Sequence, residues 1–300
     1  MRFLAILNRD GGTLRTTDLN AFSERTTEVL TQAGHSVAIR IVAGKDVVAA
    51  LSDEAARRDA DVILVGGGDG TVSSAAAQLM DTGKILAVLP AGTMNLFARG
   101  LGIPLTLDEA LQAFASGEVR EVDIGMANGR PFTHQFSIGL HARLVQLRSR
   151  MEFRSKLGKI WASIRSALGA MTNPPVMRVS LAVDGAEMIA ATTGIGVSNN
   201  LFGEGHLPYA DMPDAGILGI YVSKAASRAE IVMLFVNIAR GRWQASEQVE
   251  IHEARSVVLK VRPRRKQRCV IDGELRMLDP ETRIEIRPKA LRVLVPKAVV

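Results

Sequence analysis

The sequence predicts an α/β N-terminal domain with a doubly wound, mostly parallel sheet, followed by a mainly antiparallel β-sandwich C-terminal domain with a helical insertion. Two observations predict this class. Strand and helix patterns alternate through the first 120 residues, whereas short β-prone runs joined by Asn-Gly and Asp-Gly pairs prevail afterwards. The change divides the 300 residues into domains at 1–120 and 121–300, and the last strand is a candidate to return to the first domain.

In the first domain, apolar runs and amphipathic stretches follow one another in order. The predicted strands are 3–7, 36–42, 62–65 and 85–89, and the predicted helices are 19–33, 46–58, 73–80 and 107–116. Gly34 and Gly117 end two of these helices, and Thr106 with Glu109 has the spacing of a capping box. Ligands bind beyond the carboxyl ends of the strands in such sheets, so the loops there are the first candidates for a site.

In the second domain, the pairs Asn128-Gly129 and Asp184-Gly185 predict two hairpins. The first joins 121–127 to 130–137, and the second joins 178–183 to 186–192. Further short strands are expected at 256–261, 268–271, 282–287 and 291–295. A helical pattern over about 139–170 forms the insertion, and a second helix is expected at 228–239.

The composition narrows the functional classes. A net charge of +6 favours anionic partners such as nucleotides or an acidic lipid surface. Aromatic residues make up only 4%, with no basic segment interleaved by aromatics, so we expect no nucleic-acid binding. The single cysteine, Cys269, excludes a disulfide scaffold and fits the cytoplasm. The N-terminus is typical of a first strand rather than a signal peptide, and no apolar run reaches the roughly 18 residues of a spanning helix.

The strongest chemical signal is a glycine-rich turn between a predicted strand and a helix, Gly67-Gly68-Asp69-Gly70-Thr71-Val72. Glycines allow close approach of a ligand, and amides at a helix N-terminus bind phosphate. No lysine follows, so this is not the G-x-x-x-x-G-K-[ST] loop. A bare Asp69 would repel phosphate, so the phosphate interpretation requires a bridging Mg²⁺. The alternative is a simple turn with a solvated carboxylate.

A second loop follows the next predicted strand, with Pro90, Gly92, Thr93 and Asn95. Thr93 or Asn95 could cap the following helix, and the loop could be no more than a turn and a cap. If the two strands are neighbours in a parallel sheet, both loops lie at one edge, which favours a shared site.

These motifs, together with Asn8-Arg-Asp-Gly-Gly12, resemble the diacylglycerol kinase catalytic-domain family. More narrowly, the chain is similar to the bacterial soluble lipid kinases, which are related to sphingosine kinases and more distantly to NAD kinases. The resemblance continues at 122–125, 136–139, 157–159, 200–208 and 271–274, and so spans essentially the whole chain. It implies ATP bound in the cleft between two domains, Mg²⁺, and a lipid acceptor.

The resemblance also implies the nucleotide contacts. They fall on Gly67, Gly68, Asp69, Gly70, Thr71, Val72, Ser73 and Thr93. A further family threonine would fall near Ile41 or Val42, neither of which has a hydroxyl. Ser73 stands where Asn is common, and Leu96 stands where Asp is common, so nucleotide or lipid preference could differ.

A late Asp272-Gly273-Glu274 is a hairpin-turn signal by itself. Glu274 could also act as a general base on a lipid hydroxyl as it attacks the γ-phosphate. The resemblance implies that the family's catalytic acidic residue is Glu274, with Asp272 beside it and Asp69 organising magnesium. The turn and the catalytic interpretations are compatible.

The resemblance further implies a structural metal site in the segment 211–218. Met212 and Ile217 could offer backbone carbonyls, but Ala215 stands where the usual Asp ligand would be. Either Asp214 substitutes for it by a small shift, or the site is empty.

Two basic segments favour peripheral contact with an anionic membrane. The first, 151–168, is a basic amphipathic helix, and the second is 262–268. Alternatively, the helix packs on the β-domain and the second cluster protects a sheet edge. The five histidines lack the spacing of metal ligands, and Cys269 is expected to be a buried apolar side chain.

Together these features predict an ATP- and Mg²⁺-dependent lipid kinase that phosphorylates a diacylglycerol-like lipid, cytoplasmic and peripherally bound to membranes. One alternative is a kinase of a soluble hydroxyl compound, in the manner of NAD kinases. Another is a non-catalytic regulator that binds nucleotide or lipid. The sequence leaves a homodimer open.

Overall fold

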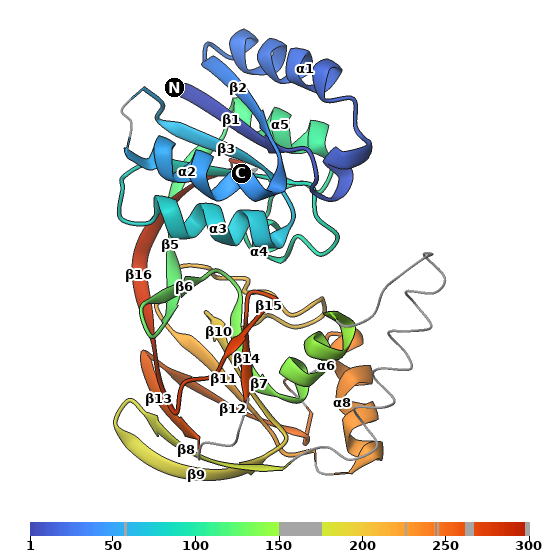
Figure 1. The fold of residues 1–300 in the computed structure, drawn as a ribbon, viewed down its shortest axis with the longest axis vertical. Helices are drawn as coiled ribbons and strands as arrows, with labels where there is room; N and C mark the ends of the chain where they lie inside the picture. The colour runs from blue at the N-terminus through green and yellow to red at the C-terminus, as the bar shows by residue number, and fades with distance from the viewer. Residues whose placement is uncertain are drawn as a thin grey trace. The chain divides into compact units, whose positions relative to one another are not determined.

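The computed structural model describes residues 1–56, 59–149, 176–225, 227–242, 244, 246–261 and 267–297. The chain forms two compact units (Figure 1). Unit 1 comprises Met1–Ile124, Asp211–Gly216 and Arg287–Val300, and unit 2 comprises Gly125–Ala210 and Ile217–Ile286. The first unit therefore takes in two short segments from the later part of the chain.

Unit 1 is built on a parallel sheet. Its strands are β1 (Arg2–Asn8), β2 (Ser36–Val42), β3 (Val62–Gly67) and β4 (Ile85–Pro90), in the order β2-β1-β3-β4. The long strand β16 (Glu281–Val295) adds its final part beside β4, also in parallel, with Arg292 opposite Ile85. β3 and β4 are buried along their whole length, because helices cover both faces of the sheet.

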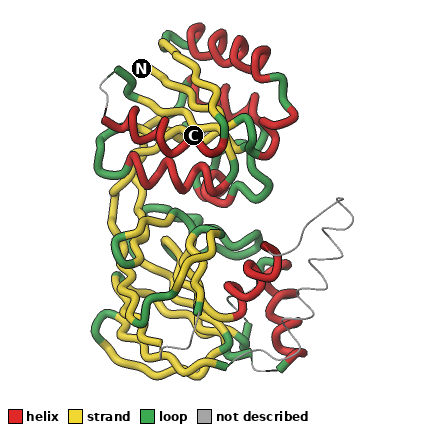
Figure 2. Tube along the Cα trace, in the orientation of Figure 1, coloured by secondary structure: helices red, strands yellow, loops and turns green. Residues whose placement is uncertain are grey.

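The helices of unit 1 occupy both faces of this sheet (Figure 2). They are α1 (Leu19–Gln32), α2 (Val47–Ala56), α3 (Asp69–Leu79), α4 (Leu96–Gly100) and α5 (Leu107–Ala115), with 3₁₀ turns η1 (Gly12–Thr16) and η2 (Gly44–Asp46). The expected cap at Thr106 is present, since its hydroxyl accepts from the Glu109 amide at 3.3 Å. The expected start of α3 at residue 73 is wrong. The helix begins at Asp69, because the extended Gly68 offers its carbonyl to the Thr71 and Val72 amides.

Unit 2 packs two largely antiparallel sheets face to face. One has the order β12-β11-β10-β7-β14-β15, and the other contains the first part of β16, then β13, β8 and β9, with β5 and β6 beside β16. Phe136 and Ile220 from the first sheet meet Leu181 and Val257 from the second in one buried cluster. The predicted fold class, doubly wound α/β followed by a β-sandwich with helices, is confirmed.

The remaining elements have these bounds, of which β5 starts in unit 1 and ends in unit 2. The strands are β5 (Glu118–Ala127), β6 (Arg130–Phe132), β7 (Gln135–Gly139), β8 (Met177–Val183), β9 (Ala186–Thr192), β10 (Gly194–Asn199), β11 (Leu218–Ser223), β12 (Val249–Ala254), β13 (Ser256–Val261), β14 (Arg268–Ile271) and β15 (Glu274–Met277). The helices are α6 (Leu140–Ser149) and α8 (Arg228–Ala239). No helix among these or elsewhere in the described residues is long and apolar enough to cross a membrane.

Three Asn-Gly or Asp-Gly pairs form the tight turns that the sequence predicts. In each, both residues have positive φ: 46° and 76° at Asn128-Gly129, 45° and 90° at Asp184-Gly185, and 45° and 85° at Asp272-Gly273. The predicted strand 130–137 is wrong in one respect. It divides at residues 133–134 into β6 and β7, which belong to different sheets.

Two predicted features fall wholly or mainly on residues that the structure does not describe. The basic amphipathic segment at 151–168 lies outside the described residues, as do residues 262–266 of the second basic cluster. Cys269 is buried, as expected, with 4% of its surface exposed.

Candidate active site

The topology of unit 1 marks where a ligand can bind. β1 is followed by β2 on one side, whereas β3 lies on its other side and is followed by β4. The order of the strands therefore reverses between β1 and β3, and open α/β sheets bind ligands beyond the carboxyl ends of the strands at such a point. The glycine-rich turn leaves β3 there, next to the Asn8 loop that leaves β1.

The two glycine loops predicted to share an edge do so. β3 and β4 pair in parallel with Gly67 opposite Pro90, and the Ala91 amide donates to the Gly67 carbonyl at 3.2 Å. The loops also touch further on. A Cβ on Gly92 would lie 2.8 Å from the Gly68 Cα, so only glycine allows this approach.

The first turn of α3 offers free amides at this edge. The first N–H groups of a helix have no partner within it. Those of Thr71 and Val72 bond to the Gly68 carbonyl, whereas those of Asp69 and Gly70 have no partner in the described part of the chain. Gly70 is exposed, and a Cβ there would meet nothing within 4 Å. This arrangement can bind phosphate oxygens.

Asp69 has a second task that the sequence did not reveal. Its carboxylate accepts from the Leu96 amide at 2.8 Å and from the Asn95 amide at 3.2 Å, so it caps α4 and joins the two loops. A carboxylate has about four acceptor sites, so two remain for a metal-bound water or a metal ion. The residues present therefore fit the Mg²⁺ that would accompany ATP: Asp69 would hold it, and it would neutralise phosphate charge.

Asn95 fixes the shape of the second loop. Its backbone is left-handed, with φ of 51°. Its side chain accepts from the Gly92 amide at 2.8 Å and donates to the Gly92 carbonyl at 3.0 Å. Thr93, held between these two residues, is exposed at the same edge.

Two residues of the first loop join the site, although no pattern in the sequence assigned either of them a role. Asn8 donates to the Thr71 hydroxyl at 3.1 Å, and Asp10 accepts from the Gly44 amide at 2.7 Å. These bonds connect the loops after β1, β2 and β3. Their signal in the sequence was only that polar residues follow an apolar strand.

The predicted nucleotide-binding residues are not equivalent in the structure. Gly67, Gly68, Asp69, Gly70 and Thr71 gather at the sheet edge with the Thr93 loop. Val72 is 4% exposed and packs in the core, so only its backbone can contact a ligand. Ser73 lies in the first turns of α3, partly buried.

Asp272 and Glu274 belong to unit 2, in the turn between β14 and β15. The Asp272 carboxylate accepts from three backbone amides, those of Thr133 (2.7 Å), His134 (2.9 Å) and Gln135 (3.0 Å), and from the Thr133 hydroxyl (3.0 Å). These bonds separate β6 from β7 and hold the turn, so Asp272 acts on Glu274 by position.

Glu274 is the first residue of β15 and its side chain is 59% exposed. Its carboxylate forms an ion pair with Arg276, which lies two residues along the strand, at 2.8 Å. An exposed ion pair of this kind is weak. The carboxylate is therefore accessible to a substrate when this pair is open.

The comparisons with known proteins agree on the family. A model of the diacylglycerol kinase catalytic domain matches residues 2–127, and a model of the YegS C-terminal NAD kinase beta sandwich-like domain matches residues 135–295, more than half of the chain. The chain belongs to the diacylglycerol kinase family.

Individual proteins are also similar to this chain. A protein named diacylglycerol kinase from Bacillus subtilis is 27% identical over 280 residues, which are 89% of this chain and 88% of that protein. The Synechocystis protein sll0036 is 26% identical over 243 residues, which are 78% of this chain. The matched part spans about half (54%) of the length of that relative. The crystal structure of a Bacillus anthracis diacylglycerol kinase has the same fold, with a TM-score of 0.74 at 21% identity over 100% of this chain and 98% of that one.

The structural metal site that this family implies does not fit the residues present. Asp214 is held by Arg120, whose Nη2 and Nε atoms donate to its two oxygens at 2.6 and 3.1 Å. Ala215 has no carboxylate, so the backbone carbonyls of Met212 and Ile217 are the predicted ligands that remain. No cluster of three or more His, Cys, Asp or Glu side chains occurs among the described residues.

Hydrogen bonds to Asp123 hold the segment Asp211–Gly216 in place. Asp123 on β5 accepts from the Gly216 amide at 2.7 Å and from the Lys289 amide at 2.9 Å, and its own amide donates to the Pro213 carbonyl at 2.9 Å. A cation would also meet the positive charge of Arg120. We therefore assign no structural metal to Met212, Asp214 and Ile217.

An apolar pocket of about 290 Å³ lies in unit 2 between the six-stranded sheet and the helices α6 and α8. Ile195 and Gly196 on β10 line it, together with Leu234 and Phe235 on α8. His141 is one of its polar groups. The Ser137 hydroxyl lies 2.6 Å from His141 Nδ1, and burial lowers the pKa of His141 to about 4, so the ring is neutral at pH 7.

Proposed function

We propose that this protein is an ATP- and Mg²⁺-dependent lipid kinase that transfers the γ-phosphate to a hydroxyl of a diacylglycerol-like lipid. The observation that carries the proposal is the apolar pocket in unit 2. Its walls are hydrocarbon apart from a few polar groups, as expected for an acyl chain and unlike a site for a soluble dinucleotide. β7, which lines the pocket, and β15, which carries Glu274, belong to the same sheet, since β7 pairs with β14 and β14 pairs with β15.

In the proposed reaction, the lipid hydroxyl oxygen forms a bond to the γ-phosphorus as the bond from that phosphorus to the ADP oxygen breaks. Glu274 takes the hydroxyl proton. The amides of Asp69 and Gly70 bind phosphate oxygens, and Asp272 holds the turn that presents Glu274. Phosphoryl transfer depends mainly on such positioning and on charge neutralisation, and Mg²⁺ supplies the latter when bound.

Phosphotransfer from γ-labelled ATP tests the proposal. The acceptors are diacylglycerol, monoacylglycerol, phosphatidylglycerol and a sphingoid base in mixed micelles, with NAD as the soluble acceptor. We expect label in a lipid and none in NAD, and loss of activity in Glu274→Gln. Glu285→Gln is the matched control, because Glu285 forms the same exposed pair with an arginine two residues away on a strand. Label in NAD alone, or nucleotide binding without turnover, would remove the proposal.

The pocket has a test of its own. Gly196 lines it, and a Cβ there would touch neighbours only at ordinary distances, the nearest at 3.8 Å. Leucine at this position should fill the space for a chain with little strain. We expect Gly196→Leu to reduce activity toward long-chain acceptors far more than toward short-chain ones. An equal effect on both would show that the chain does not lie in this pocket.

Access to a lipid acceptor requires contact with membranes, and we propose that the protein binds them peripherally from the cytoplasmic side. The net charge of +6 and the basic segments support this. Sedimentation with vesicles of phosphatidylglycerol, and not of phosphatidylcholine alone, is the expected result. Equal sedimentation with both would contradict an electrostatic contact.

A further inference from the structure

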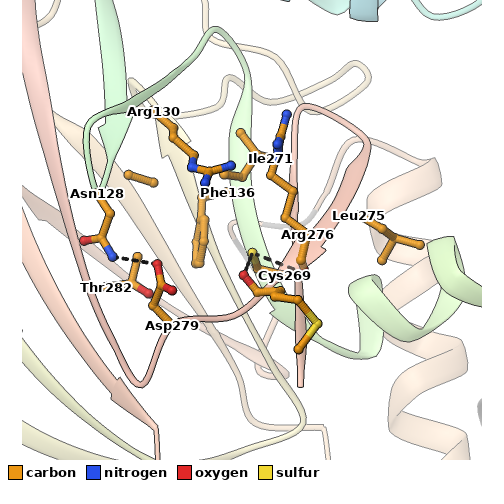
Figure 3. Close-up of a pocket in the computed structure, with 11 residues that line it drawn as sticks. Asn128, Arg130, Phe136, Cys269, Ile271, Leu275, Arg276, Asp279 and Thr282 are labelled. Carbon is orange, nitrogen blue, oxygen red and sulfur yellow. Dashed lines mark hydrogen bonds between the residues drawn. The ribbon is translucent and has the colours of Figure 1, made fainter. Parts of the chain in front are cut away.

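A second pocket in unit 2, of about 320 Å³, has a different character (Figure 3). We call it the arginine pocket, after Arg130 from β6 and Arg276 from β15, which reach into it from opposite sides. Phe136 and Cys269 contribute apolar walls. The arginine pocket shares no lining residue with the glycine loops or with the apolar pocket.

The arginine pocket has more positively charged than negatively charged side chains in its wall. The Arg130 side chain makes no ion pair or hydrogen bond with any described residue. Asp279, the one acidic side chain in the wall, accepts from Asn128 Nδ2 at 2.9 Å. Burial raises the pKa of the Cys269 thiol, so the thiol adds no negative charge. The pocket therefore holds two guanidinium groups against one carboxylate.

The wall also contains an unpaired polar group. Thr282 is 3% exposed, and its hydroxyl has no hydrogen-bond partner among the described residues. Buried hydroxyls in proteins nearly always have a partner. A polar ligand or a water beside this wall is the simplest way to supply one.

We propose that the arginine pocket binds a phosphate-type oxyanion, and that the bound anion competes with Glu274 for Arg276. Arginine binds phosphate through two parallel N–H donors, and Arg130 adds a second guanidinium to the same anion. The pair that must be exchanged is exposed on both sides, with Arg276 at 43% and Glu274 at 59%, and such pairs are easily broken.

The proposal rests on the proposed function, because it makes the pocket a regulator of Glu274. While the ion pair is formed, the Glu274 carboxylate is occupied by the Arg276 guanidinium at 2.8 Å. When the anion takes Arg276, Glu274 is released to accept the proton of the lipid hydroxyl. Occupation of the pocket should therefore raise turnover. The anion could be a phospholipid headgroup or free phosphate, since both carry the same oxygens.

Binding is measured separately from turnover, so that the two proposals can fail separately. The full chain, saturated with a non-hydrolysable ATP analogue to fill the nucleotide loop, is titrated calorimetrically with inorganic phosphate and with phosphatidylglycerol or phosphatidylcholine vesicles. Arg130→Gln should weaken the binding of the effective anion about tenfold or more. Arg283→Gln is the matched control, an exposed arginine of the same unit that lies outside the pocket, and it should bind as the parent does.

Turnover then tests the coupling. With a neutral lipid acceptor and no added anion, Arg130→Gln should match the parent but lose activation by the anion. Arg276→Gln should show raised basal turnover and no further response. Equal anion binding by the parent and Arg130→Gln would overturn the pocket assignment. Anion binding with no change in turnover would overturn the competition, and absence of lipid phosphorylation despite Arg130-dependent binding would overturn only the proposed function.

Discussion

Asp272 offers the sharpest test of how unit 2 holds its candidate catalytic residue. Its carboxylate accepts four hydrogen bonds from residues 133–135. Each bond to a charged acceptor contributes about 1.5 kcal/mol or more in mutational series. Asparagine tolerates the left-handed turn but keeps one acceptor oxygen, so Asp272→Asn should lose two of the four bonds. We expect it to lower the free energy of unfolding by about 2–3 kcal/mol.

The chain supplies a matched control in the hairpin between β8 and β9. Asp184 has the same turn geometry, with φ of 45°, and its carboxylate accepts from the Ser256 amide at 2.8 Å and the Arg255 amide at 3.1 Å. This turn is exposed, so Asp184→Asn should cost only about 1 kcal/mol. Urea denaturation gives both values, and phosphotransfer gives the activity of each folded variant.

The two variants should differ more in activity than in stability. Asp272→Asn should lower kcat because it loosens the turn that presents Glu274, whereas Asp184→Asn should keep the activity of the parent. A stability loss under 0.5 kcal/mol in Asp272→Asn would refute the four-bond account. Equal activities in the two variants would refute the positioning role.

Two further predictions concern pH and metal. The folded-state pKa of His141 is about 4, below the ordinary 6.5, so between these pH values the unfolded chain binds a proton that the folded chain does not. The contribution of the neutral ring to the free energy of unfolding is therefore fully present above pH 6.5. It should fall by about 3 kcal/mol as the pH is lowered from 6.5 to 4. His141→Gln should flatten that slope in urea denaturation, and an unchanged slope would exclude His141 as its source. A chelator should leave the melting temperature of the nucleotide-free protein unchanged, whereas Arg120→Leu should destabilise it by about 0.5–1 kcal/mol through the loss of the Asp214 pair. A chelator-induced fall in melting temperature would show that a structural metal is present after all.

The features that the sequence predicted well are those that depend only on residues close together in the chain. The Asp-Gly and Asn-Gly turns need only two residues with positive φ, and the buried strands need only continuous apolar runs. The adjacency of the two glycine loops followed from the rule that successive strands of such folds are neighbours. These signals placed the turn at Gly67–Thr71 without any long-range information.

The features that it missed depend on contacts between distant residues. Asp69 reaches the amide of Leu96, and Asp272 reaches amides 137 to 139 residues earlier in the chain. Such bonds leave no periodic pattern, because one carboxylate satisfies several backbone groups at once. The ion pair between Arg120 and Asp214 also joins distant residues, and it occupies the carboxylate that the implied metal site would need. The sequence did not predict the early start of α3, because Gly70 has a low helix propensity. In the structure, hydrogen bonds to the carbonyl of the extended Gly68 start the helix at Asp69.

Nucleotide binding depends most on the free amides of the glycine turn, and Gly70→Ala tests them most directly. A Cβ at this position meets no protein atom within 4 Å, and alanine favours a helix over glycine by about 0.5–1 kcal/mol, so the variant should be at least as stable as the parent. The new methyl group would stand where a phosphate must approach. We predict, by calorimetric titration with ATP and Mg²⁺, an affinity at least about tenfold weaker than that of the parent. Gln78→Ala, near the far end of α3, should bind normally. A Gly70→Ala protein that is stable and binds ATP as tightly as the parent would contradict the account.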